Sequence, residues 1–176
     1  MQVFVGFATA QGSTRGIAES IADRLRSQGI EVQLEEIAKL PEVLRFDAAV
    51  LGSAIHSGRW LPEATQVMAK RSTDLRNRPL WLFSVSSVGE TSSFFPRLVA
   101  GAMRGMRSET TEIKEFRKQL GIRGHRNFAG AVAKGDWGRT GDVFLRGLGG
   151  RYGDRRDWAD IDAWADQIAA ALQERQ

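Results

Sequence analysis

The residues of this sequence best suited to binding a ligand form a short loop, Thr9-Ala10-Gln11-Gly12-Ser13-Thr14, after an apolar run at the N-terminus. Hydroxyl groups and unpaired backbone amides at the start of a helix bind phosphate, and the helix dipole favours the anion there. Gly12 lets the backbone turn close to a ligand, and the Gln11 amide is a further donor. The pattern predicts a phosphate-binding loop. The alternative is a capped turn that only begins a helix.

Two other kinds of phosphate loop do not fit these residues. A Walker loop needs Gly-Lys before its Ser or Thr, whereas Gly12 is followed by Ser13 and Thr14. A Rossmann dinucleotide loop needs three spaced glycines after the first strand, and only Gly6 and Gly12 flank this turn. A monophosphate held by neutral donors fits better than a pyrophosphate.

The loop lies between a predicted strand and a predicted helix. Val3, Val5 and Phe7 alternate in an apolar run, which predicts a buried strand over residues 3–8. Beyond the loop, apolar residues recur at helical spacing until Gly29, a residue that often ends helices: Ile17, Ala18, Ile21, Ala22 and Leu25. Strand, loop and helix therefore open the fold.

The alternation of strands and helices continues along the chain. Further elements are predicted as strands at 31–37, 46–52, 79–85 and 127–133, helices at 62–71 and 110–120, and a last helix with Trp158, Ile161, Ala165, Ile168 and Leu172 on one face. This order predicts an α/β fold in which a doubly wound, five-stranded parallel sheet carries helices on both faces. Ligands of such sheets bind outside the carboxyl ends of the strands.

Two later strand ends carry small polar residues that would face the same ligand. The third predicted strand leads into Ser53-Ala54-Ile55-His56-Ser57-Gly58, within a loop that extends to Trp60. The fourth leads into Ser86-Ser87-Val88-Gly89. Because the carboxyl ends of parallel strands meet at one edge, we expect these two loops to lie beside the phosphate loop.

Together these segments resemble the flavodoxin family. The loop at residues 9–14 is similar to the flavodoxin phosphate loop, a Ser or Thr followed by Thr-Gly-x-Thr, and departs from it at Gln11. The resemblance implies strand order 2-1-3-4-5 and non-covalently bound FMN, with the second and third loops on either side of its isoalloxazine ring. The cofactor-binding residues that it implies are Thr9, Ala10, Gln11, Gly12, Ser13, Thr14, Ser53, Ala54, Ile55, His56, Ser57, Gly58, Ser86, Ser87, Val88 and Gly89.

Over nearly its whole length the chain is similar to the menaquinone-dependent protoporphyrinogen IX dehydrogenase branch of that family. The likeness rests on the segment Gly52 to Trp60, on Phe128-Ala129-Gly130-Ala131, and on a long insertion before a Trp-bearing last helix. It implies an FMN-dependent oxidoreductase that passes electrons from an organic substrate, such as a porphyrinogen, to a quinone.

The insertion, at about residues 134–156, would lie near the flavin if the resemblance holds. It contains fewer apolar residues than expected for a strongly membrane-docked enzyme, and Asp136, Asp142 and Asp154 add negative charge. Porphyrin specificity therefore stays open at this point.

His56 occupies a position where flavodoxins often place an aromatic residue beside the flavin. It is a candidate to stack on the ring, to tune its potential or to move a proton. Trp60, Trp137 and Tyr152 are further candidates for stacking, each with core packing as the alternative. No metal site is predicted, since His125 is the other histidine and lies near the start of the fifth strand.

Residues 92–109 combine apolar side chains with arginines. Phe94, Phe95, Leu98, Val99, Met103 and Met106 lie among Arg97, Arg104 and Arg107. Such a basic amphipathic pattern is compatible with a helix on a membrane surface or on a partner, and equally with a helix packed on the core. A flat apolar face in residues 92–106 would also permit a homodimer.

Composition and length narrow the choice of class. The 176 residues, 42% hydrophobic and 26% charged, suit one domain spanning 1–176. The sequence has no cysteine, so a redox function needs an imported cofactor. A pI near 9.9 favours anionic surfaces, but the scattered arginines form no motif for specific nucleic-acid binding. With no apparent signal peptide, a cytoplasmic location is expected.

Two other functions remain open. A flavodoxin-type electron-transfer protein is one, although such shuttles are usually acidic and this chain is basic. A flavodoxin-like binding module without flavin is the other. The sequence offers no acid-base constellation, so catalytic residues stay unassigned; FMN chemistry needs few of them.

Overall fold

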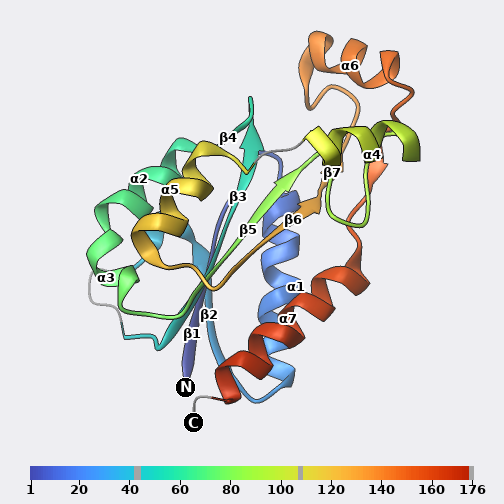
Figure 1. Cartoon of the computed structure of the whole chain (residues 1–176). Coiled ribbons are helices and arrows are strands. Elements are labelled where there is room, and N and C mark those ends of the chain that lie inside the picture. Colours follow the sequence, from blue (N-terminus) through green and yellow to red (C-terminus); the bar gives the residue numbers. More distant parts are fainter. Residues whose placement is uncertain (42–44, 107–108, 175–176) are drawn as a thin grey trace.

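The computed structural model describes residues 1–41, 45–106 and 109–174. Its main sheet holds five parallel strands in the order β2-β1-β3-β5-β6 (Figure 1). Their bounds are β1 Gln2–Ala8, β2 Glu31–Glu36, β3 Ala48–His56, β5 Leu80–Ser86 and β6 Gly124–Ala129. Counted along the chain, these are strands 2-1-3-4-5, so the predicted α/β architecture is confirmed.

Three short strands, which were not predicted, bring the strand count above five. β4 (Arg59–Trp60) pairs antiparallel with the end of β3. β7 (Ala131–Val132) and β8 (Gly153–Asp154) form a separate antiparallel pair that brackets most of the insertion. The insertion is thus closed at its base by a two-stranded ladder.

Helices cover both faces of the sheet (Figure 1). On one face lie α1 (Ser13–Ser27) and α7 (Trp158–Gln173); on the other lie α2 (Pro62–Lys70), α3 (Ser72–Arg76) and α5 (Thr111–Leu120), and the short 3₁₀ helix η1 (Ile37–Lys39) also packs on that side. Each face has its own buried core because the central strands carry apolar residues on both sides.

Two further helices project beyond the carboxyl ends of the strands. They are α4 (Arg97–Met106) and α6 (Gly138–Gly147), which lie together at the top of Figure 1. A third, smaller apolar cluster joins them to the loop after β5; its buried members are Val88, Phe94, Phe95, Val132 and Leu145. This cluster is separate from the two cores that flank the sheet.

Several predicted boundaries were wrong. β3 continues to His56, so half of the predicted loop after it is strand. Phe46 precedes that strand and stacks on Phe4, with ring centroids 5.4 Å apart. β6 begins at Gly124, three residues before its predicted start. Trp158 is 42% exposed and lies under the Arg156 guanidinium, not on the apolar face of α7. The predicted amphipathic segment forms α4, and its Arg107 lies outside the described residues.

Candidate functional site

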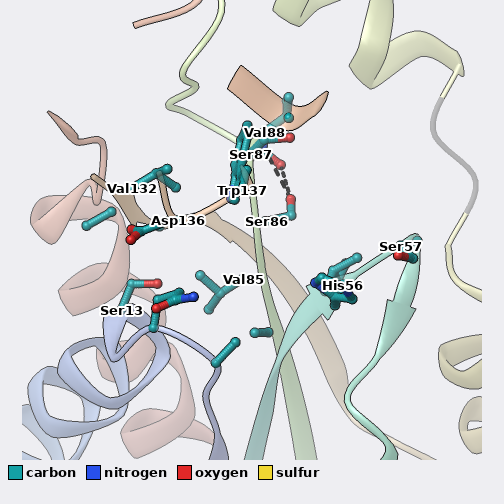
Figure 2. Close-up of a pocket in the computed structure, with 18 of the residues that line it drawn as sticks. Ser13, His56, Ser57, Val85, Ser86, Ser87, Val88, Val132, Asp136 and Trp137 are labelled. Atoms are coloured by element: carbon teal, nitrogen blue, oxygen red, sulfur yellow. Dashed lines mark hydrogen bonds between the residues drawn. The ribbon is translucent and has the colours of Figure 1, made fainter. Parts of the chain in front are cut away.

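A cavity of about 750 Å³ opens at the carboxyl edge of the sheet (Figure 2). Such a volume is within the usual range for small-molecule sites. Its walls come from the loop before α1, the β3–β4 hairpin, the end of β5 and the loop after it, the α4–α5 region, the turn from β6 into β7 and the start of the insertion. Of the predicted site residues, those lining it are Ala10, Gln11, Ser13, Ala54, Ile55, His56, Ser57, Gly58, Ser86, Ser87 and Val88.

The start of α1 is arranged for an anion. Gly12 is the residue before the helix, with a left-handed φ of 86°, and no side chain caps the helix. The Thr9 hydroxyl instead accepts the Gly12 amide at 2.9 Å, which fixes the turn. The first turn carries no acidic residue, and its dipole is therefore uncompensated. The alternative considered above, a turn whose side chains only cap the helix, does not fit, because no side chain caps the N-terminus of α1.

Thr14 is fully buried at the second position of α1, and its Oγ1 has no hydrogen-bond partner among the described residues. A buried hydroxyl without a partner costs free energy, roughly 1–3 kcal/mol. The Thr14 hydroxyl is therefore able to donate a hydrogen bond to a bound ligand. Thr9, Gly12 and Thr14 do not line the cavity themselves.

The β3–β4 hairpin brings His56 to the cavity. Ser57 and Gly58 both have positive φ, 50° and 78°, which makes the tight two-residue turn suited to a hairpin. Ser53, predicted to bind the cofactor, is buried below this turn; its hydroxyl accepts the Leu61 amide at 3.0 Å and donates to the Ala54 carbonyl at 2.9 Å. Ser53 thus ties the hairpin together and lies off the cavity wall.

The loop after β5 is fastened from two sides. The guanidinium of Arg104 donates to the carbonyls of Gly89 and Ser92 at 2.8 and 3.1 Å. A Cβ at Gly89 would lie 2.4 Å from the Ala129 amide nitrogen, so the loop lies directly on the end of β6. Gly89 therefore permits this close approach and does not line the cavity.

The sequence did not predict about half of the lining. Val85, Gly130, Ala131 and Val132 come from strand ends and the turn beside them, Met103, Met106 and Thr110 from the α4–α5 region, and Asp136, Trp137 and Gly141 from the insertion. Of these, only Trp137 had been considered individually as a ligand contact, although the family resemblance implied that the insertion as a whole lies near the flavin. Nothing in the sequence indicated that α4 would reach the cavity, because that contact depends on tertiary packing.

A second, polar cavity of about 220 Å³ adjoins the first, sharing Ile55 and Thr110 as walls. His125 lies here, with its side chain 4% exposed and Nε2 2.9 Å from the Ser84 hydroxyl. That hydroxyl accepts the indole N–H of Trp60 at 2.7 Å. Trp60 is buried against Phe116, so packing, and not stacking on a ligand, is its role.

Electrostatics in this second cavity centre on Glu109. The Arg117 guanidinium donates to its Oε1 at 2.6 Å and holds the pKa of Glu109 below its ordinary value. The same oxygen lies 3.7 Å from His125 Nδ1. His125 and His56 thus line different, adjoining cavities.

Comparisons with known proteins agree with this geometry. A family model for a flavodoxin domain matches residues 4–137. Over 90 residues the chain is 28% identical to protoporphyrinogen IX dehydrogenase [quinone] of Escherichia coli K12, a match covering 50% of each protein. The aligned part thus spans about half the length of that relative.

Solved structures share the fold at low sequence identity. A flavodoxin mutant from Pseudomonas aeruginosa superposes with a TM-score of 0.59 at 12% identity, covering 98% of this chain and 99% of that one. Rubredoxin oxygen:oxidoreductase from Desulfovibrio gigas gives 0.61 at 15%, over 98% of this chain and 36% of that one.

The family model covers well over half of the sequence and includes all three predicted loops. The chain therefore belongs to the flavodoxin family, and that membership indicates FMN as its cofactor.

Proposed function

We propose that this chain is an FMN-dependent oxidoreductase that takes electrons from a small organic donor and passes them to a quinone. Protoporphyrinogen IX is the first donor to test, because the similar Escherichia coli protein is named for it. The proposal treats residues 1–176 as one FMN-binding domain, with residues 134–156 as an insertion into it.

The observation that carries the proposal is the apolar extension of the large cavity. Met103 and Met106 of α4, Val132 of β7 and Trp137 of the insertion line it together with the three loops. A pure electron shuttle needs only an exposed ring edge. An added apolar wall suits an enzyme that must also receive an organic molecule beside the cofactor.

The residues present fit FMN. The uncapped α1 N-terminus and the buried Thr14 hydroxyl suit its phosphate. Gly130 leaves room for the Ser13 side chain beside them, since a Cβ at position 130 would lie 2.8 Å from Ser13 Oγ. We propose that residues 9–14 hold the phosphate, and that the segments at 53–58 and 86–89 flank the ring. FMN, when bound, supplies the two-electron chemistry.

The chain's own contribution is then to orient the cofactor and keep water from it. The fastened loop after β5 holds Ser86, Ser87 and Val88 in place, and Ser86 Oγ bonds within that loop to the Val88 carbonyl at 3.0 Å. His56 projects from the hairpin toward the cavity (Figure 2), where its ring is placed to stack or to exchange a proton.

We further propose peripheral contact with an anionic membrane surface, the place where a lipid-soluble quinone is found. It would use an α4–α6 patch of exposed apolar residues: Leu98, Met106, Val143, Phe144 and Leu148, at 89, 79, 72, 52 and 37% exposure. Exposed Arg97, Arg139 and Arg146 accompany it. Met106 belongs both to this patch and to the cavity wall. No helix among the described residues is long and apolar enough to cross a membrane.

The test is a pair of rate measurements on FMN-loaded protein without oxygen. We expect protoporphyrinogen to be oxidised faster than by free FMN at equal concentration, and the reduced protein to be reoxidised by a menaquinone analogue. Failure of both would leave only a generic flavoprotein. Rapid reduction by a flavodoxin reductase with no quinone reaction would favour the electron-transfer alternative, and failure to retain FMN the flavin-free binding module.

A further inference from the structure

We propose that Trp137 forms an aromatic wall of the flavin site, so that the insertion supplies a ring contact that the loop after β5 lacks. The inference rests on FMN as cofactor and does not depend on which donor or acceptor the protein uses.

The wall of the large cavity offers few aromatic rings. The loop after β5 offers only Ser86, Ser87 and Val88, none of them aromatic. Among the described residues that line the cavity, Trp137 and His56 alone have aromatic rings. Figure 2 shows Trp137 on the same side of the cavity as Ser87 and Val88, with His56 across from it. A flat ring anchored by its phosphate near Ser13 would extend between them.

The indole of Trp137 is held in position by its neighbours. Trp137 precedes the first turn of α6, and its ring meets the Phe94 ring edge-on, with centroids 5.8 Å apart and planes at 71°. Phe94 is itself 2% exposed. The turn before it is closed by the Asp136 carboxylate, which accepts the Ala133 amide at 2.7 Å.

Gly141 completes this support one turn later. A Cβ at Gly141 would lie 2.4 Å from the Cβ of Trp137, closer than such atoms approach. A helical glycine costs stability relative to alanine, about 1 kcal/mol. Its place here is explained by the room that it leaves for the tryptophan, so Trp137 keeps its position only while residue 141 lacks a side chain.

Half-buried Trp137 thus has one ring edge on Phe94 and remaining surface toward the cavity. Stacking a flavin on that surface would remove apolar area from water, which favours binding. Offset stacking of the electron-rich indole on the electron-poor isoalloxazine would strengthen binding further. The insertion then acts as part of the cofactor site as well as a lid on one end of the sheet.

The experiment measures FMN affinity and the fluorescence of bound FMN in Trp137→Leu, Trp137→Phe and Gly141→Ala. The control is Val143→Ser on the exposed side of the same helix, 72% exposed. We expect Trp137→Leu to weaken binding roughly tenfold and Gly141→Ala to weaken it several-fold, with Trp137→Phe between wild type and Leu. A stacked indole quenches flavin emission, so bound FMN should brighten in Trp137→Leu and Trp137→Phe.

Combining Gly141→Ala with Trp137→Gly gives a second readout, because glycine removes the Cβ of residue 137 that an alanine at 141 would meet. If Gly141 acts by leaving room for the tryptophan, the alanine should cost no further affinity once residue 137 has no side chain. Unchanged affinity and unchanged emission in Trp137→Leu would overturn the inference while leaving the proposed function intact. Wild-type protein that binds no FMN would overturn both. Circular dichroism of the apo variants identifies any loss of fold, in which case the Trp137→Phe emission decides.

Discussion

The loop before α1, which we propose holds the phosphate, and the α4–α6 region face the same cavity but are built in different ways. The loop is short, its residues are neighbours in sequence, and it leads directly into helix α1 on the core of the sheet. The α4–α6 region draws on two segments far apart in sequence, residues 88–103 and 132–152, has a small apolar cluster of its own, and leaves large side chains such as Leu98 and Val143 exposed.

This difference indicates that the two regions have separate roles. A binding element whose contacts are backbone amides and one buried hydroxyl is specific for a small anion and tolerates little change. A separate cluster joined to the sheet by loops can vary without disturbing the main cores, so substrate access and surface contacts can be adjusted there. The predictions below test how independent the two regions are.

The largest expected effect is a difference in stability between a variant of the sheet core and a variant of the α4–α6 cluster. Leu82 and Leu145 are both fully buried, in the sheet core and in the α4–α6 cluster respectively. Leu82→Ala should lower the free energy of unfolding by about 2–5 kcal/mol. Leu145→Ala should leave global unfolding nearly unchanged but abolish amide-exchange protection in α6. Denaturant melts and hydrogen exchange measure the two. Equal loss of global stability would show one cooperative unit.

The next effect concerns the buried hydroxyl of Thr14. Thr14→Val keeps the shape and removes an oxygen without a partner, so it should stabilise the apo protein by about 1 kcal/mol. The same change should weaken FMN binding roughly ten- to a hundredfold, because a donor to the phosphate is lost. Thermal melts and FMN titration check both signs, with Thr73→Val on exposed α3 as control. Destabilised apo protein with unchanged affinity would assign Thr14 to packing.

A smaller effect is expected at the α4–α6 patch. Leu98→Ser combined with Phe144→Ser should reduce sedimentation with phosphatidylglycerol vesicles several-fold and leave FMN binding unchanged. Trp158→Ser, an exposed apolar residue outside the patch, is the matched control. Unaltered vesicle binding would argue against the patch. A shift in apparent mass without vesicle binding would assign it to a homodimer.

The smallest effect lies far from the cavity, between α1 and α7. Arg24 donates to both carboxylate oxygens of Asp166 at 2.7 and 2.8 Å, which lowers the pKa of Asp166. A lowered carboxyl pKa stabilises the fold above the ordinary value, and the gain is lost as pH falls toward the folded value. Asp166→Asn should therefore flatten the fall of Tm between about pH 5 and pH 3. The pair is partly exposed, with side chains 41% and 38% accessible, so the difference should shrink in 1 M salt.

Much of the fold could be predicted from short stretches of the sequence. The β1–loop–α1 unit was predicted from neighbouring residues because its strand alternation, glycine turn and helical spacing are all written within a short stretch. The hairpin at Ser57 and Gly58 was missed, since strand β3 outlasts its apolar run and the polar residues near its end read as loop. Trp158 was misplaced because helical spacing alone cannot show where a helix leaves the core.

The candidate site was predictable only where it is contiguous in sequence. Gln11, His56 and Ser87 reach the cavity from strand ends, whose meeting at one edge follows from parallel topology. Met103 reaches it because α4 folds back over that edge, and nothing in the sequence of α4 indicates this return. Asp136 comes from the insertion, whose place near the flavin was implied by the family resemblance alone. Such contacts depend on tertiary packing.

The hairpin turn also bears on how this cavity could change over time. Ser57 adopts a left-handed φ of 50° that glycine or asparagine would accept at lower cost. Substitution of this one exposed residue would alter the β3–β4 turn next to His56 and leave both cores that flank the sheet unchanged. Position 57, at the rim of the cavity, can therefore change with little loss of fold stability. Descendants of this sequence could acquire new ligand preferences there while keeping the same fold.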